Sequence, residues 1–171
     1  TKVSKEFADV YKGDYAHFTL KEISEQPDSI SQAGNNDQIQ QFVDGIKQAK
    51  NLYITGSGTS YNAAEIAKYL MSKFAKIKIN TVIASELPFS PDDIERDSTL
   101  IAISQSGESA DVLEAVKIAK ESNADILSIV NHLNSSLSQE SSLVMGLNCG
   151  PEIGVAATKS FTSQLAILYK I

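Results

Sequence analysis

The sequence predicts an α/β fold: three layers, α/β/α, with a five-stranded parallel sheet between two layers of helices. Short apolar runs of the kind that a buried strand requires alternate with stretches whose apolar residues recur at helical spacing. Strands that alternate with helices are joined by right-handed crossovers, which give a parallel sheet covered on both faces. Five strands fit the flavodoxin-like order 2-1-3-4-5, in which a crevice opens at the carboxyl ends of the first and third strands.

The composition favours one well-buried domain with a small-molecule or protein partner. The chain has 171 residues, 42% of them hydrophobic, and a formal net charge of −6 from 15 basic and 21 acidic residues. One core fits this length, and the acidic balance disfavours a nucleic acid or an anionic membrane as partner. Cys149 is the only cysteine and no long apolar run occurs, so we expect a cytoplasmic location.

Neither a metal nor a cofactor is expected. His17 and His132 lie far apart, without carboxylates at the spacing of a ligand set. Gly56 and Gly58 follow an apolar run, but Tyr61 occupies the third glycine position of the dinucleotide motif G-x-G-x-x-G. These glycines therefore indicate a tight turn that needs positive φ.

The chain is divided into a linker and amino-terminal helical segment, residues 1–36, and a main domain, residues 37–171. Residues 1–14 are polar with scattered aromatics, which indicates an arm. No glycine, proline or polar tail follows the last helical stretch, so we expect the chain to be a fragment of a larger protein.

The first helices are expected before the sheet. Residues 17–30 have helical spacing, and Pro27 predicts a helix that ends or bends near Gln26. Asp37 is the expected cap of a second helix that extends to Ile46. We expect both helices to pack on the outside of the sheet.

The remaining strands and helices are predicted from short apolar runs and from apolar residues at helical spacing, respectively. Strands are predicted at 51–55, 77–84, 100–103, 124–130 and 141–147. Residues 77–84 alternate before they become continuously apolar, which favours an edge strand. Helices are predicted at 61–74, 110–119 and 155–171.

The loop Ser104–Ser109 carries the main functional signal. It follows a buried strand and precedes a helix, and it holds three serines and a glutamine. Unpaired N–H groups and the dipole at a helix start, together with neutral donors, can hold an anion without lysine or arginine. Phosphate is the natural candidate. The alternative is that these serines only cap the helix, which we expect one of them to do. The strand order brings this loop beside Gly56–Ser60, which also carries hydroxyls.

Separated motifs give the chain a specific resemblance. GSGTSYNA (56–63), ISQSGESAD (103–111) and GPEIGVAATKSFTSQL (150–165) resemble the first sugar isomerase (SIS) domain of the glutamine:fructose-6-phosphate amidotransferases, and HFTLKEISEQP (17–27) resembles the segment that precedes it. The likeness covers essentially the whole chain. It implies the SIS fold, a sugar-phosphate ligand (fructose 6-phosphate, glucose 6-phosphate or glucosamine 6-phosphate) and a role in making glucosamine 6-phosphate from fructose 6-phosphate and glutamine.

The resemblance also implies the site residues. The phosphate would be held by Ser104, Gln105, Ser106 and Ser109, with Thr59 and Ser60 near the sugar and Val155 and Ala157 forming a wall. Ser109 replaces a usual threonine and keeps the hydroxyl, and Ser57 replaces a frequent cysteine. Ala157 replaces a common serine and removes a side-chain hydrogen bond, which leaves the exact sugar open.

No catalytic residue is expected in this chain. The resemblance puts the isomerase catalytic residues in a second SIS domain beyond Ile171, and Cys149 has no nearby histidine partner. Lys159 and Glu152 are the alternative acid and base groups. Glu108 would repel a phosphate, so we expect its carboxylate to point away and favour the helix start.

Two other functions are compatible with the motifs. One is a SIS-type glucosamine-6-phosphate deaminase, against which the segment 17–27 argues; the other is a non-catalytic sugar-phosphate sensor, which usually carries a basic effector module that is not found here. A homodimer is expected, because the helix predicted at 155–171 has more branched residues than one buried face needs.

Overall fold

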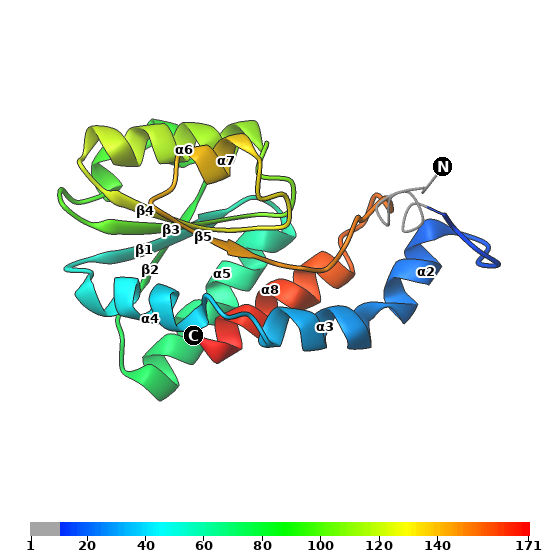
Figure 1. The fold of residues 1–171 in the computed structure, drawn as a ribbon. Coiled ribbons are helices and arrows are strands. Elements are labelled where there is room, and N and C mark those ends of the chain that lie inside the picture. Colours follow the sequence, from blue (N-terminus) through cyan, green and yellow to red (C-terminus); the bar gives the residue numbers. More distant parts are fainter. Residues whose placement is uncertain (1–10) are drawn as a thin grey trace.

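The computed structural model describes residues 11–171, so most of the predicted arm at 1–14 lies outside the described residues. The sheet has five parallel strands: β1 (Leu52–Gly56), β2 (Asn80–Ile83), β3 (Thr99–Ser104), β4 (Asp125–Val130) and β5 (Leu143–Gly146). Their order is β2-β1-β3-β4-β5, which confirms the predicted topology (Figure 1). As expected, β2 lies at an edge.

Helices cover both faces of the sheet (Figure 1). One face carries α6 (Ala110–Glu121) and the short α7 (Ser136–Gln139). The other carries α4 (Ile39–Gln48), α5 (Thr59–Leu70) and α8 (Lys159–Lys170), with α3 (Gln26–Gly34) packed against α8. The other elements are the α-helix α2 (Phe18–Ser24), the π-helical η1 (Met71–Ala75), and the 3₁₀ turns η2 (Leu87–Phe89) and η3 (Pro91–Asp93).

The core has two halves, one on each side of the sheet. Alternate residues of β3 point to opposite faces, so that Leu100 packs with Val116 of α6 while Ile101 packs with Phe42 of α4. All four side chains are at most 1% exposed. A strand buried on both faces requires the continuous apolar run from which β3 was predicted.

The amino-terminal helices show one confirmed prediction and one error. The helix breaks at Glu25, and Pro27 sits in the first turn of α3, where its missing N–H costs nothing. Asp37 does not cap the next helix. The Oδ1 atom of Asn36 instead accepts the N–H of Gln38 at 2.9 Å, and α4 begins one residue later.

The last helix also differs from its prediction. It begins at Lys159 rather than Val155, because an extended loop precedes it. Its branched residues are used inside the molecule: Ile167 and Leu168 are buried, whereas Tyr169 is 72% exposed. The surplus apolar surface that motivated a dimer is therefore absent from most of α8. Within residues 11–171, no helix combines the length and apolar character needed to cross a bilayer.

Candidate functional site

The loops after β1 and β3 meet at one pocket of about 190 Å³ at the carboxyl ends of these strands. Its lining residues are Ser57, Thr59, Ser60, Ile103, Ser104, Gln105, Ser106, Ser109 and Val112. The structure thus brings the predicted phosphate-binding residues and the predicted sugar-side pair, Thr59 and Ser60, into a single pocket. No lysine or arginine of the described residues lines it.

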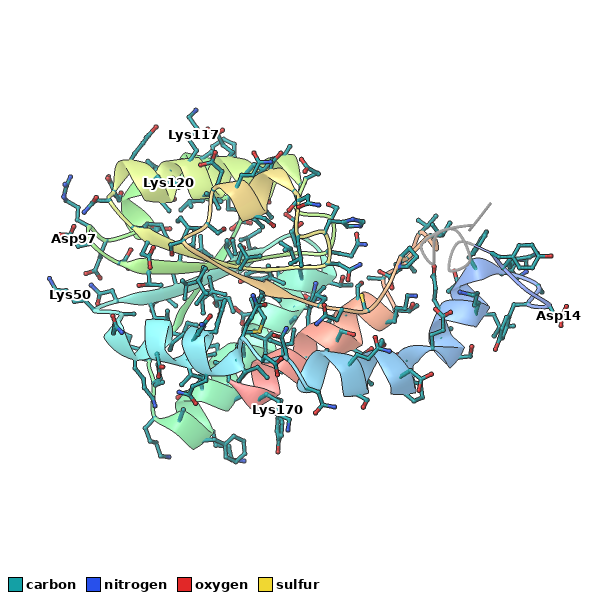
Figure 2. The ribbon with its side chains drawn as sticks, viewed as in Figure 1. Asp14, Lys50, Asp97, Lys117, Lys120 and Lys170 are labelled. Carbon is teal, nitrogen blue, oxygen red and sulfur yellow. The ribbon has the colours of Figure 1, made fainter. Side chains whose placement is uncertain are left out.

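The charged side chains labelled in Figure 2 lie elsewhere. Lys50 and Asp97 stand at the end of the sheet where strands begin, opposite to the pocket, and Lys117 and Lys120 project from α6 (Figure 2). An anion in the pocket would therefore rely on neutral donors and on the starts of α5 and α6.

Glycines shape the turn that follows β1. Gly58 has φ of 56° immediately before α5, a conformation that other residues rarely adopt. A Cβ atom at Gly56 would lie 2.9 Å from the backbone carbon of Ser60. The tight-turn interpretation is confirmed, and its effect is to place Thr59 and Ser60 in the first turn of α5 at the rim of the pocket.

The serines of the β3 loop bond within the loop rather than capping α6. The Oγ atom of Ser104 accepts the N–H of Gly107 at 3.0 Å, and the Oγ atom of Ser106 accepts the N–H of Glu108 at 3.1 Å. Ser109 is the residue before α6 but makes no side-chain capping bond, so the expected serine cap is wrong. Because Ser104 and Ser106 already accept a backbone N–H, their own hydroxyl hydrogens remain to donate.

The pocket includes Ser57, to which the sequence assigned no role, and Ser60, whose hydrogen-bond partner was not predicted. The Oγ atom of Ser57 is buried and has no hydrogen-bond partner among the described residues. The Oγ atom of Ser60 accepts a hydrogen bond of 3.0 Å from Nε2 of Gln164 on α8. The place of Ser57 in a ligand loop was a usable signal, but nothing local in the sequence connects Ser60 with a glutamine on the last helix.

A neighbouring loop braces the β3 loop. Gly107 has φ of 70°, and a Cβ atom there would lie 2.1 Å from Oγ of Ser135. The carbonyl oxygen of Gly107 accepts the N–H of Leu137 at 3.0 Å. Only glycine allows this approach, which fixes the loop that carries Ser104 and Ser106.

Glu108 points away from the pocket. Its carboxylate accepts the N–H and the hydroxyl of Ser136, each at 2.8 Å. The hydrogen bond from the Ser136 backbone is the main cause that lowers the pKa of this carboxyl. The expected direction is right, but the carboxylate binds the start of α7 rather than that of α6.

Val155 and Ala157 are not among the residues that line the pocket. The loop that carries them extends beyond the carboxyl edge of the sheet toward α2 (Figure 1). There the buried carboxylate of Glu22 accepts the N–H of Gly154 at 2.9 Å, and Val155 is fully exposed. The predicted wall residues are thus held apart from the pocket, and their role remains a prediction.

The other candidate reactive groups are bound in structural contacts. Nζ of Lys159 lies 2.6 Å from the Glu25 carboxylate, and the Glu152 carboxylate accepts the N–H of Thr158 at 2.9 Å before α8. Desolvation by burial raises the pKa of the Cys149 thiol to about 12. None of these lines the pocket, nor does His132. Residues 11–171 contain no group of three or more histidine, cysteine or acidic side chains arranged to hold a metal ion.

Comparisons with known proteins agree with this geometry. The SIS domain family model matches residues 45–170. A glutamine–fructose-6-phosphate aminotransferase (isomerizing) from Pyrococcus horikoshii is 43% identical over 160 residues, which are 92% of this chain and 27% of that protein. The chain therefore spans about a quarter of the length of such relatives.

Two solved structures resemble the fold closely. The C-terminal domain of glucosamine-fructose-6-phosphate aminotransferase from Francisella tularensis matches with a TM-score of 0.85 and 39% identity, over 94% of this chain and 47% of that one. Glucosamine-6-phosphate deaminase from Thermotoga maritima matches with a TM-score of 0.72 and 26% identity, over 90% of this chain and 47% of that one.

Proposed function

This chain belongs to the SIS domain family, and we propose that it binds a phosphorylated sugar whose phosphate occupies the pocket between the β1 and β3 loops. The observation that carries the proposal is the convergence of neutral donors on that pocket. Three of its serines, Ser60, Ser104 and Ser106, accept an N–H group and so keep their hydroxyl hydrogens for a ligand.

A phosphate suits these donors better than a neutral ligand does. Hydrogen bonds to a charged group contribute about 1.5–3 kcal/mol each, compared with about 1 kcal/mol for neutral pairs. The starts of α5 and α6, which follow β1 and β3, add a partial positive charge at the same carboxyl edge of the sheet. These groups hold a dianion without requiring a cation.

The sugar itself extends out of the pocket in this proposal. The pocket volume of about 190 Å³ is below the ~300–1,000 Å³ of ordinary small-molecule sites, so it fits a phosphate with only part of a sugar. The rest of the sugar would lie toward the last loop, where Val155 and Ala157 are the proposed wall. Fructose 6-phosphate, glucose 6-phosphate and glucosamine 6-phosphate are the proposed ligands.

The whole protein, in this proposal, transfers an amino group from glutamine to fructose 6-phosphate and isomerises the product to glucosamine 6-phosphate in the cytoplasm. The named relatives support this activity, while the chain matches only 27% of the Pyrococcus horikoshii protein. Residues 37–171 would supply the sugar-phosphate-binding domain and residues 1–36 the linker with its helices.

We also propose that the chain binds its ligand without turning it over. Isomerisation requires a base within hydrogen-bond reach of the sugar carbons and a pKa near neutrality. Glu108 is the ionisable side chain of the two loops, and Ser136 holds it away from the pocket with a lowered pKa. Binding without such a base lowers the ligand's free energy but not the barrier.

A homodimer remains part of the proposal, with a different surface from the one first expected. Phe74 of η1, 68% exposed, and Tyr169 of α8, 72% exposed, line one groove, and Tyr69 at the end of α5 is 69% exposed. Such a patch favours association. Light scattering at micromolar concentration should show a dimer that Phe74→Glu weakens; a monomer of the wild-type chain would contradict this part of the proposal.

Calorimetry tests the binding proposal directly. Fructose 6-phosphate should bind the 171-residue chain, inorganic phosphate should compete, and fructose should not bind. An enzyme-coupled assay then follows the interconversion of fructose 6-phosphate and glucose 6-phosphate. Turnover above blank that disappears in Glu152→Gln or Glu108→Gln would overturn the assignment of binding without catalysis.

A further inference from the structure

The amino-terminal half of α8 buries a series of polar side chains: Lys159 (3% exposed), Ser160 (1%), Ser163 (0%) and Gln164 (1%). A buried polar group destabilises a fold unless it is hydrogen-bonded. Lys159 is paired with Glu25 and Ser160 with Glu152. Gln164 needs its own explanation, because an apolar side chain of the same length would fill this position at lower cost.

The contact that Gln164 makes leads into the pocket. Its Nε2 atom donates to Oγ of Ser60 at 3.0 Å, across 104 residues of sequence. Its Oε1 atom is buried and has no partner among residues 11–171. The amide therefore makes one of the four hydrogen bonds that its two N–H groups and its carbonyl oxygen allow, and that bond serves a serine that lines the pocket.

In that bond the Ser60 oxygen is the acceptor, so the hydroxyl hydrogen of Ser60 is not used in the contact with Gln164. A serine in a helix commonly donates its hydroxyl hydrogen to the carbonyl one turn earlier. Here the Ser60 oxygen accepts from Gln164, and the carbonyl of Gly56, four residues earlier at the end of β1, receives the N–H of Ala84 at 3.3 Å. The Ser60 hydrogen finds no acceptor in the described part of the protein.

We propose that Gln164 is a positioning residue that aims the hydroxyl hydrogen of Ser60 at the phosphate of the bound ligand. The inference rests on the proposed sugar-phosphate function. Ser104 and Ser106 support it, because each also accepts an N–H and is left to donate. The difference is that their N–H partners belong to the same loop, whereas Ser60 depends on a helix from the far end of the chain. A donor that is fixed before binding loses less conformational entropy when the anion arrives.

A double-mutant cycle tests whether Gln164 acts through Ser60. The variants are Gln164→Met, which keeps the length of the side chain without a donor, Ser60→Ala, and the two combined. The affinities of inorganic phosphate and fructose 6-phosphate for the 171-residue chain are measured by calorimetry. Ser163→Ala is the matched control, because Ser163 is equally buried on the same helix and its hydroxyl has no hydrogen-bond partner among residues 11–171.

The expected result is a loss of about three- to tenfold in both affinities for Gln164→Met, and no further loss when it is added to Ser60→Ala. Ser163→Ala should bind as the wild type does. If Gln164→Met weakens binding equally in the wild type and in Ser60→Ala, or does not weaken it in either, the inference about Gln164 is wrong while the proposed function stands. Failure of the wild-type chain to bind either probe overturns the proposed function together with this inference. Gln164→Leu replaces Gln164→Met in the cycle if circular dichroism shows that the methionine variant is unfolded.

Discussion

Replacement of Ser104 by alanine is the most informative single change in the pocket. Ser104 is 4% exposed, and its Oγ atom accepts the N–H of Gly107 at 3.0 Å while its hydrogen is left for the ligand. Loss of one hydrogen bond to a charged group costs about 1.5–3 kcal/mol. At about 1.4 kcal/mol for each factor of ten, Ser104→Ala should weaken sugar-phosphate binding about ten- to a hundredfold.

The same change should also affect folding. Without Oγ, the N–H of Gly107 loses its acceptor, which costs about 1–3 kcal/mol of unfolding free energy. Ser128 provides the control: it is 0% exposed on the adjacent strand β4, and its hydroxyl has no partner among the described residues. Ser128→Ala should leave affinity unchanged and unfolding free energy equal or higher. Calorimetry and urea unfolding measure both quantities. A folded Ser104→Ala variant that binds within twofold of the wild type would refute the assignment of this pocket.

Three further expectations follow from buried or charged groups outside the phosphate contacts. Cys149, 5% exposed and with a pKa raised to about 12, should resist alkylation by iodoacetamide at about pH 8 until denaturant is added, because the thiolate is the reactive form; rapid alkylation of the folded chain would contradict this. Glu22→Ala removes the acceptor of the Ile153 and Gly154 N–H groups, so hydrogen exchange should accelerate in the loop before α8 and unfolding free energy should fall by about 1–3 kcal/mol; unchanged exchange would show that Glu22 does not hold the loop. Because the pKa of Glu108 is lowered from its ordinary value of 4.5, the ionised carboxylate stabilises the fold at pH values above 4.5, and this stabilisation disappears as pH falls through the folded-state pKa. The difference in unfolding free energy between the wild type and Glu108→Gln should therefore shrink from about pH 6 to about pH 3. A difference that grows as the pH falls would contradict this expectation.

The topology of the sheet could be predicted because its signals are local. Each strand contains a short apolar stretch, and in β3 every side chain is buried, so the pattern there is continuous rather than alternating. The crossover rule then leaves few strand orders to consider. The position of the two hydroxyl-rich loops at the switch point followed from that order, and the pocket they form is where it was expected.

Helix boundaries could not be predicted where a distant or unexpected side chain sets them. Residues 155–157 have a composition that suits a helix, but Glu22 takes the N–H of Gly154, and Glu152 takes the N–H of Thr158 and of Ser160. These carboxylates hold the segment in a non-helical loop until Lys159. One of them lies on α2, at the other end of the sequence, so no local periodicity reports it.

In the candidate site, too, some features depend on residues that are neighbours in the sequence and others on residues that are far apart in it. The motif around Ser104 identifies a ligand loop, because hydroxyls, an amide and a glycine cluster between a strand and a helix. The bond from Gln164 to Ser60 joins residues that only the packing of α8 on α5 brings together. The sequence therefore indicates the two ligand loops, whereas the hydrogen bond from Gln164 to Ser60 is visible only in the structure.

Backbone amide chemical shifts during a titration with fructose 6-phosphate can show whether the sugar phosphate occupies the pocket between the β1 and β3 loops, because they report both binding and location. Amides of the segments 57–60 and 104–109 should shift together with one dissociation constant, and inorganic phosphate should shift the same amides. Charge alone would instead place an anion beside Lys68, Lys76 and Lys78, which line a separate pocket near the start of β2. Shifts confined to that lysine cluster, with none at the two loops, would contradict the account.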